Sequence, residues 1–215
     1  MSSTEKQNTY TTTNTYSTLN VLGPQTKNVW IVFHGIGYLS RYFINFFDTL
    51  PENENYIIAP QAPSKYYLNG QYKHVGASWL TREKTDIEIE NVLNNIDSVF
   101  QKENVTDAMN LIVFGFSQGV SIAARWVAKR KIECNKLVLY AGGLPNELNT
   151  KDFNFLWKNK TEVIVIIGDA DEYLTPERME SENQKIKILF EGRVRKISFV
   201  GGHEVKKELI TDLVN

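Results

Sequence analysis

The 215-residue sequence contains a single cysteine, Cys134. One cysteine cannot form an internal disulfide, so the chain is not one of the small secreted domains that depend on cross-links, and a reducing compartment suits it. Cys134 stands just before the apolar run at residues 136–140, where a free cysteine is most often a small buried apolar residue. We therefore predict a packing role for Cys134 rather than a chemical one.

Neither sign of charge is in excess, because 24 basic residues are balanced by 25 acidic ones and the formal net charge is −1. Such a chain has no summed positive field to hold a phosphate backbone, so nucleic acid is not expected as a partner. The one local basic run, residues 129–131, is predicted to lie near a helix C-terminus, where cations complement the helix dipole.

Long apolar runs are also missing. The polar first 20 residues hold no stretch of the length that a signal peptide or a membrane span needs. We therefore expect a cytoplasmic protein without a membrane span. Residues 1–8 are predicted to form a disordered tail, whereas residues 9–19 alternate Thr, Tyr and Asn in a way that suits an edge strand or hairpin.

What the sequence does contain is a set of apolar runs rich in β-branched residues. They do not alternate with polar residues, as expected for the strands of a parallel sheet that is covered on both faces. The five clearest runs are residues 29–33 (VWIVF), 56–59 (YIIA), 111–114 (LIVF), 136–140 (KLVLY) and 163–167 (VIVII). A shorter run over residues 194–200 ends at two glycines and is predicted to be the last strand.

Helical patterns separate these runs. Apolar residues recur at three- and four-residue steps over residues 85–100, which predicts an amphipathic crossover helix. Further helices are predicted over residues 117–130, 175–190 and 203–213, with Pro176 at the first helical position after Thr175. Alternating strands and helices predict a three-layer α/β fold with a mostly parallel sheet, as one domain over residues 9–215. The segment 141–155 is too short to carry a cap domain.

One serine lies between two glycines where a strand run gives way to a helix run. The pentapeptide GFSQG at residues 115–119 fits the Gly-x-Ser-x-Gly pattern of a nucleophile elbow, a tight turn in which bulky side chains two positions from the serine would collide with backbone. A glycine-rich turn with a solvent-facing serine has the same local pattern. A phosphate loop is a poorer match, because the Walker lysine is missing. Ser117 is therefore a candidate nucleophile.

A serine hydroxyl needs a general base and an acid that orients the base. Of the three histidines, only His203 follows Ser117 in the sequence, and it comes directly after the predicted last strand. Asp171 and Asp169 follow the strand at residues 163–167 and are the candidate acids. We prefer Asp171, because a residue immediately off a strand end more often caps the loop than reaches across to the histidine.

The same acidic cluster has part of a calcium-loop spacing, with Asp169, Asp171 and Glu180 at positions one, three and twelve. Leu174 occupies the position that requires glycine, Tyr173 replaces a ligand, and a strand precedes the loop. No metal site and no cofactor are therefore predicted.

The early strand predicted over residues 29–33 ends in the sequence His34, Gly35, Ile36, Gly37. Its place in the chain is where a hydrolase with a nucleophile elbow offers one of two oxyanion donors. We assign the donors to the backbone amides of Ile36 and Gln118, with Gly37 as the alternative to Ile36.

These motifs together resemble the α/β-hydrolase superfamily and, within it, the phospholipase/carboxylesterase family that includes acyl-protein thioesterases. The resemblance runs from about residue 28 to the C-terminus. It is carried by HGIG at 34–37, APQAPS at 59–64, ASW at 77–79, GFSQG at 115–119, GDADEYLTP at 168–176 and GGH at 201–203. It implies Ser117 as nucleophile, His203 as base and Asp171 as acid. The chain departs from the family after HGIG and after Asp171, which puts the substrate class in question more than the chemistry.

The sequence thus predicts a serine hydrolase that cleaves esters or thioesters through an acyl-enzyme. The alternative is a catalytically silent fold of the same kind that binds a ligand or a protein. The long loop over residues 60–82 is rich in aromatics, and Trp79 within it and Tyr38 are predicted to contact substrate. The acyl chain, the leaving group and the oligomeric state do not follow from the sequence.

Overall fold

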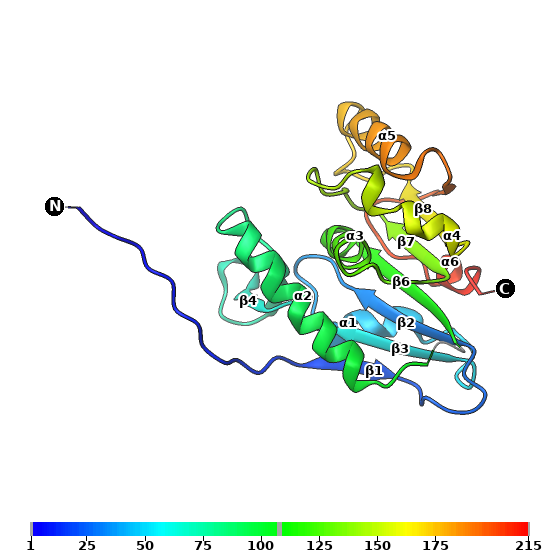
Figure 1. The fold of residues 1–215 in the computed structure, drawn as a ribbon, viewed down its shortest axis with the longest axis horizontal. Coiled ribbons are helices and arrows are strands. Elements are labelled where there is room, and N and C mark those ends of the chain that lie inside the picture. Colours follow the sequence, from blue (N-terminus) through cyan, green and yellow to red (C-terminus); the bar gives the residue numbers. More distant parts are fainter. Residues whose placement is uncertain (1, 107–108, 215) are drawn as a thin grey trace.

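The computed structural model describes residues 2–106 and 109–214. A seven-stranded sheet with the order β1-β3-β2-β6-β7-β8-β9 forms its centre (Figure 1). Only β1 runs antiparallel to its neighbour, so the prediction of a mostly parallel sheet is confirmed. The strands are β1 (Tyr16–Leu19), β2 (Asn28–Phe33), β3 (Asn55–Pro60), β6 (Asn110–Phe116), β7 (Lys136–Tyr140), β8 (Glu162–Gly168) and β9 (Arg195–Phe199).

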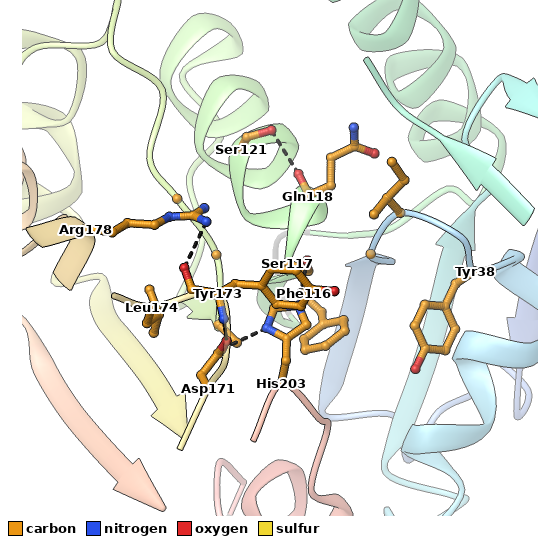
Figure 2. Close-up of a pocket in the computed structure, with 15 residues that line it drawn as sticks. Tyr38, Phe116, Ser117, Gln118, Ser121, Asp171, Tyr173, Leu174, Arg178 and His203 are labelled. Atoms are coloured by element: carbon orange, nitrogen blue, oxygen red, sulfur yellow. Dashed lines mark hydrogen bonds and ion pairs between the residues drawn. The ribbon is translucent and has the colours of Figure 1, made fainter. Parts of the chain in front are cut away.

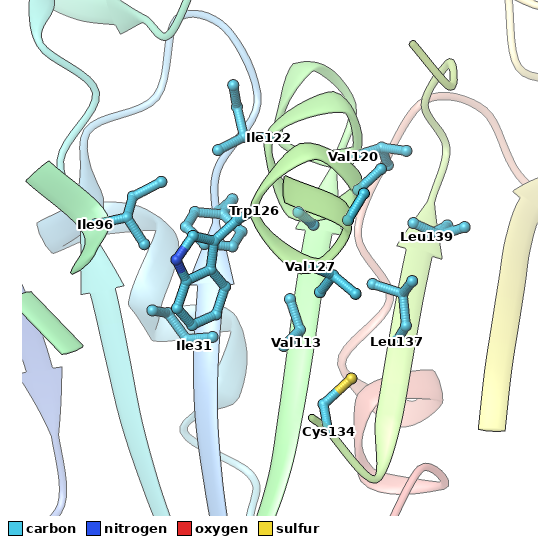
Figure 3. Packing of buried hydrophobic residues seen from close by; sticks show 14 of the residues in the cluster. Ile31, Ile96, Val113, Val120, Ile122, Trp126, Val127, Cys134, Leu137 and Leu139 are labelled. Carbon is cyan, nitrogen blue, oxygen red and sulfur yellow. The ribbon is translucent and has the colours of Figure 1, made fainter. Parts of the chain in front are cut away.

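The apolar runs are strands because both faces of the sheet are buried. Neighbouring residues of one strand, such as Trp30 and Ile31, are fully buried in different clusters on opposite faces. Helices α2 (Thr85–Lys102), α3 (Gln118–Arg130), α4 (Asn154–Lys158) and α5 (Pro176–Phe190) contribute to one cluster, while α1 (Ser40–Phe43) and α6 (Lys207–Thr211) contribute to the other. Figure 3 shows Trp126 and Val127 of α3 above Ile31 and Val113 of the sheet. The three-layer α/β prediction is therefore confirmed.

The ends of the predicted helices agree with the structure except at the C-terminus. Thr175 caps α5 by accepting a hydrogen bond from the Arg178 amide at 3.3 Å, and the basic run at residues 129–131 lies at the end of α3. The helix predicted over residues 203–213 is wrong in its first turn. The His203 amide donates to Glu172 and the Lys206 amide donates to the Tyr140 hydroxyl, so this stretch is a loop and α6 begins at Lys207.

Cys134 is buried, as predicted. Its thiol has a pKa raised to about 12 by that burial. At neutral pH the residue therefore holds a neutral thiol, which packs as a small apolar group.

The long connection after β3 folds into a separate two-stranded hairpin. Its strands are β4 (Ser64–Tyr67) and β5 (Val75–Ser78), with a 3-10 turn at Leu68–Gly70. The connection between β7 and β8 holds a 3-10 turn at Thr150–Asp152 and the short α4, so no cap domain is inserted there. A further 3-10 turn, Ile44–Phe47, follows α1.

The N-terminal strand is shorter than predicted, because regular pairing with β3 covers only Tyr16–Leu19. Residues 2–15 have no regular secondary structure. Asn14 and Thr15 still hydrogen-bond to the backbone of Gln61 after β3, and the residues before them extend away from the sheet in Figure 1. Among the residues described, no helix has the length and apolar character needed to cross a membrane.

Candidate active site

Ser117 lies in a sharp turn between β6 and α3. Its φ of 54° and ψ of −119° are strained for a residue that has a side chain, and its amide is held by the Tyr140 carbonyl at 2.9 Å. A positive φ at a non-glycine residue persists only where the surroundings enforce it. The turn directs the Ser117 hydroxyl into a pocket at the carboxyl ends of the strands.

Three glycines leave room for this turn. A Cβ atom on Gly115 would lie 2.4 Å from the Gly119 carbonyl oxygen, and one on Gly119 would lie 2.0 Å from the Phe33 oxygen. At Gly142, which also lines the pocket, a Cβ would lie 2.2 Å from the backbone carbonyl oxygen of Ser117. The two glycines of GFSQG are thus required by close backbone contacts of the turn with itself and with β2, as the pattern predicts.

The structure brings Ser117, His203 and Asp171 together from three strand ends. The imidazole Nε2 of His203 is 2.8 Å from the Ser117 hydroxyl, and Nδ1 is 2.8 Å from a carboxylate oxygen of Asp171. A carboxylate oxygen accepts, so Nδ1 carries a proton and Nε2 accepts the hydrogen bond from the hydroxyl. The Asp171 side chain is 1% exposed and that of His203 is 15% exposed, so solvent barely competes for these bonds.

Two aromatic rings and one backbone amide fix the histidine and its acid. The rings of Phe116 and Tyr173 have centroids 5.1 Å and 4.7 Å from that of His203. The second carboxylate oxygen of Asp171 accepts from the Tyr173 amide at 2.9 Å. Asp169 faces elsewhere, because its carboxylate accepts from the Gly201 amide at 3.0 Å and links the ends of β8 and β9. This is the loop-capping position that the sequence favoured for Asp169.

Ile36 and Gln118 both line the pocket, and neither of their backbone amides has a hydrogen-bond partner among the described residues. The Gly37 amide already donates to the Ala77 carbonyl at 2.9 Å, which excludes the alternative considered from the sequence. The Gly35 carbonyl accepts from Nδ1 of His34 at 2.7 Å. Because a trans peptide points its N–H and C=O in opposite directions, this bond turns the Ile36 amide away from His34.

A buried polar network lies behind the loop that carries the Ile36 amide. Nε2 of His34 accepts from the Ala62 amide at 3.2 Å, and the Gln61 side chain accepts from the Ser40 amide at 2.9 Å. His34 is fully buried, and desolvation lowers its pKa to about 4, so the ring is neutral at pH 7.

Trp79 belongs to this support and not to the pocket wall. Its side chain is fully buried, and its indole N–H donates to the His34 carbonyl at 2.8 Å. The prediction that Trp79 contacts substrate is therefore wrong, because its polar edge faces the backbone of the loop that carries Ile36. Tyr38, the other predicted contact, does line the pocket.

The pocket around Ser117 has a volume of about 440 Å³. Figure 2 shows Tyr38 on one side of Ser117 and Arg178 on the other. The sequence gave no role to Arg178, because a lone arginine in the first turn of an exposed helix resembles any solvated charge. Nor did it give one to Gln61, although that residue lies in the APQAPS stretch. In the described part of the chain, no cluster of three or more His, Cys, Asp or Glu side chains could hold a metal ion.

A family model described as Phospholipase/Carboxylesterase matches residues 20–215. No curated protein matches the sequence. Acyl-protein thioesterase 2 from Zea mays has a TM-score of 0.70 at 16% identity, over 94% of this chain and 96% of that one. A phospholipase/carboxylesterase from Dyadobacter fermentans has a TM-score of 0.65 at 19% identity, over 96% and 98% of the two chains. A carboxylesterase from Bacillus cereus has a TM-score of 0.65 at 14% identity, over 93% and 91%. These structures share the fold with this chain.

Proposed function

The chain belongs to the phospholipase/carboxylesterase family of esterase- and thioesterase-type hydrolases, with their α/β-hydrolase fold, and from that premise we propose that Ser117, His203 and Asp171 hydrolyse carboxylic esters or thioesters. The observation that carries the proposal is the pair of 2.8 Å contacts of His203, one to the Ser117 hydroxyl and one to the Asp171 carboxylate. A hydroxyl bonded to a neutral imidazole that is oriented by a carboxylate is an activated nucleophile.

The reaction proceeds in two steps. The Ser117 oxygen attacks the carbonyl carbon as its proton passes to Nε2 of His203, and the same proton then goes to the departing alcohol or thiol. Water next attacks the acyl-enzyme, giving its proton to His203. His203 then passes a proton to the Ser117 oxygen as the bond between that oxygen and the acyl carbon breaks and the acid leaves. Asp171 stays ionised and stabilises the imidazolium that forms in each step.

The Ile36 and Gln118 amides are the proposed oxyanion donors. Both residues line the pocket beside Ser117, and neither amide donates a hydrogen bond to another described group. The charge on the carbonyl oxygen grows in the transition state, so preformed donors stabilise that state more than the substrate. Each such donor contributes about 3 kcal/mol.

The proposed substrate is a small or acyl-chain ester or thioester. The pocket is open to solvent, and Tyr38 packs edge-on against Phe43 and Phe116 at centroid distances of 5.7 Å and 6.2 Å, which gives one side of the pocket an aromatic wall. We place an apolar part of the substrate against this wall. A cytoplasmic location remains a prediction from the sequence.

The test is hydrolysis of 4-nitrophenyl butyrate by the wild type and by Ser117→Ala. We expect the variant to lose at least about a thousandfold in kcat/KM, because the nucleophile is gone. A fluorophosphonate should label the wild type once, on Ser117, as read by peptide mass. Equal hydrolysis by both proteins would refute the assignment. No hydrolysis and no labelling of the wild type would favour a silent binding protein instead.

A further inference from the structure

Arg178 places a cationic group on the wall of the pocket that contains Ser117. The residue lies in the first turn of α5, and one guanidinium nitrogen donates to the Tyr173 carbonyl at 3.0 Å (Figure 2). This bond uses one of the five N–H donors of the side chain and holds the group at the pocket. We propose that Arg178 binds a carboxylate or phosphate carried by the substrate, so that the preferred ester or thioester is anionic. This inference rests on the proposed hydrolysis and narrows its substrate class.

The positive charge of Arg178 has no counterion among the residues that the structure describes. In residues 2–106 and 109–214, no carboxylate lies within 4.0 Å of its guanidinium. The acidic groups near the pocket are engaged elsewhere. Asp171 is bonded to His203, and Glu182 accepts from the Leu144 amide and from Lys185, each at 2.9 Å.

The nearby Glu172 is likewise engaged, because its carboxylate accepts from the His203 amide at 3.2 Å. Glu177, next to Arg178, is fully exposed, and its pKa is lowered by hydrogen bonds to its own amide and to Thr175 at the start of the helix. These carboxylates bind backbone amides or other basic side chains. The guanidinium donors of Arg178 that do not bond to Tyr173 are therefore left for an anion from outside the protein.

Two consecutive glycines of the pocket lie between the backbone of Ser117 and this arginine. A Cβ on Gly142 would lie 2.2 Å from the backbone carbonyl oxygen of Ser117, and a Cβ on Gly143 would lie 3.3 Å from Oε1 of Glu182 and 3.6 Å from a guanidinium nitrogen of Arg178. Both glycines line the pocket, and consecutive Cα atoms are about 3.8 Å apart. Neither glycine has a side chain to fill the pocket between Ser117 and Arg178, so part of a bound substrate can extend along these two residues toward Arg178.

The two sides of the pocket differ in chemistry. Tyr38 gives an aromatic wall on one side of Ser117, while Arg178 gives a fork of donors on the other (Figure 2). Arginine donors match the paired oxygens of a carboxylate or phosphate. Arg178 is exposed, so water and salt weaken the attraction, and we expect a preference of about tenfold rather than an absolute requirement.

The test uses matched pairs of substrates. The first pair is the mono-4-nitrophenyl ester of adipic acid and the same ester with its free carboxyl methylated, which places the charge on the acyl part. The second pair is 4-acetoxy-3-nitrobenzoate and its methyl ester, which places the charge on the leaving group. For each pair, the ratio of kcat/KM for the anionic over the neutral substrate is measured in the wild type, Arg178→Gln, Arg178→Lys and Lys187→Gln.

Lys187→Gln is the matched control, because Lys187 is an exposed cation of the same helix and does not line the pocket. We expect Arg178→Gln to lower the ratio about tenfold in at least one pair, Arg178→Lys to lie in between, and Lys187→Gln to keep the wild-type ratio. The pair that responds identifies which half of the substrate is charged.

An unchanged ratio in both pairs would overturn the inference. If the unchanged ratio comes with an equal loss of kcat/KM for the anionic and neutral substrates, Arg178 only holds the Tyr173 loop. Failure of the proposed function is distinct: the wild type would then not cleave the neutral esters, or Ser117→Ala would cleave them equally well.

Discussion

The side-chain oxygen of Gln118 accepts a hydrogen bond from the Trp79 amide at 2.8 Å. The amide nitrogen of the same side chain donates to the Leu80 carbonyl at 2.8 Å, and the Trp79 indole donates to the His34 carbonyl. The residue after Ser117 is thereby tied, through Trp79, to the loop that presents the Ile36 amide. Gln118 thus has two separate parts: a backbone N–H that faces the pocket and a side chain that faces away from it.

Replacing the Gln118 side chain should therefore impair catalysis without removing a donor. In Gln118→Ala the backbone amide remains, but its attachment to the β5 end is lost, and a small misplacement of an oxyanion donor is costly. We expect kcat for 4-nitrophenyl butyrate to fall about tenfold with little change in KM. Gln184→Ala, on the exposed face of α5, is the control. An unchanged kcat would show that the backbone alone positions the amide.

The acid of the site can be tested by a pair of neighbouring substitutions. Asp171→Asn keeps the shape of the side chain but offers His203 an amide in place of a carboxylate, which disturbs the tautomer that accepts the serine proton. We expect kcat to fall about a thousandfold or more. Asp169→Asn keeps an oxygen that can accept from the Gly201 amide, and we expect a loss of less than about tenfold. If the two variants lose equally, or the order is reversed, Asp171 is not the acid.

Much of the fold could be predicted because a strand that is buried on both faces has an uninterrupted apolar sequence. Residues 29–33 and 111–114 are apolar at every position. The first run lies inside β2 and the second inside β6. The helix at α2 was predictable because one face alone packs on the sheet, with Ile89, Val92 and Ile96 buried. The hairpin of β4 and β5 was not, since its strands pair only with each other and β4 is exposed throughout.

The site could be anticipated where its chemistry needs a particular residue at a strand end. Ser117 and His203 each follow a strand and have glycine neighbours, so their positions can be read from short motifs. Trp79 could not be assigned in this way, because a tryptophan near a site looks the same in sequence whether its ring contacts substrate or its N–H holds backbone. No sequence motif marks Arg178, because its proposed role depends on whether the fold pairs it with a carboxylate, and sequence spacing does not show this.

The close approach of α3 to β2 makes Gly119 sensitive to a single methyl group. Alanine is otherwise favoured over glycine in a helix by about 1 kcal/mol, which would stabilise the variant. A Cβ here, however, lies 2.0 Å from the Phe33 oxygen, so backbone must move. We expect Gly119→Ala to lower the free energy of unfolding by about 1–3 kcal/mol in urea. Gly23→Ala, where nothing lies within 4 Å, should change it by less than about 0.5 kcal/mol. If the two variants had comparable free energies of unfolding, a methyl group at residue 119 would not force the backbone to move.

His34 should make the stability of the protein depend on pH. Its folded pKa is lowered by burial to about 4, against 6.5 for an unperturbed histidine. Between these values the unfolded chain binds a proton that the folded protein does not, so stability is fully present above about pH 6.5 and is lost as the pH falls toward 4. From these two values, the loss between pH 7.5 and pH 5 is about 2 kcal/mol.

The variant His34→Asn separates this effect from other titrations. Asparagine has no proton to gain in this range, while its amide retains a donor near the Gly35 carbonyl that Nδ1 of His34 now occupies. Urea unfolding of both proteins at pH 7.5 and pH 5 gives the free energy of unfolding at each pH. The wild type should lose about 2 kcal/mol more than His34→Asn on acidification, because carboxylates that titrate in both proteins cancel in the difference. Parallel losses in the two proteins would mean that His34 accepts a proton in the folded state as readily as in the unfolded chain, and that its neutral form does not hold the loop that carries Ile36.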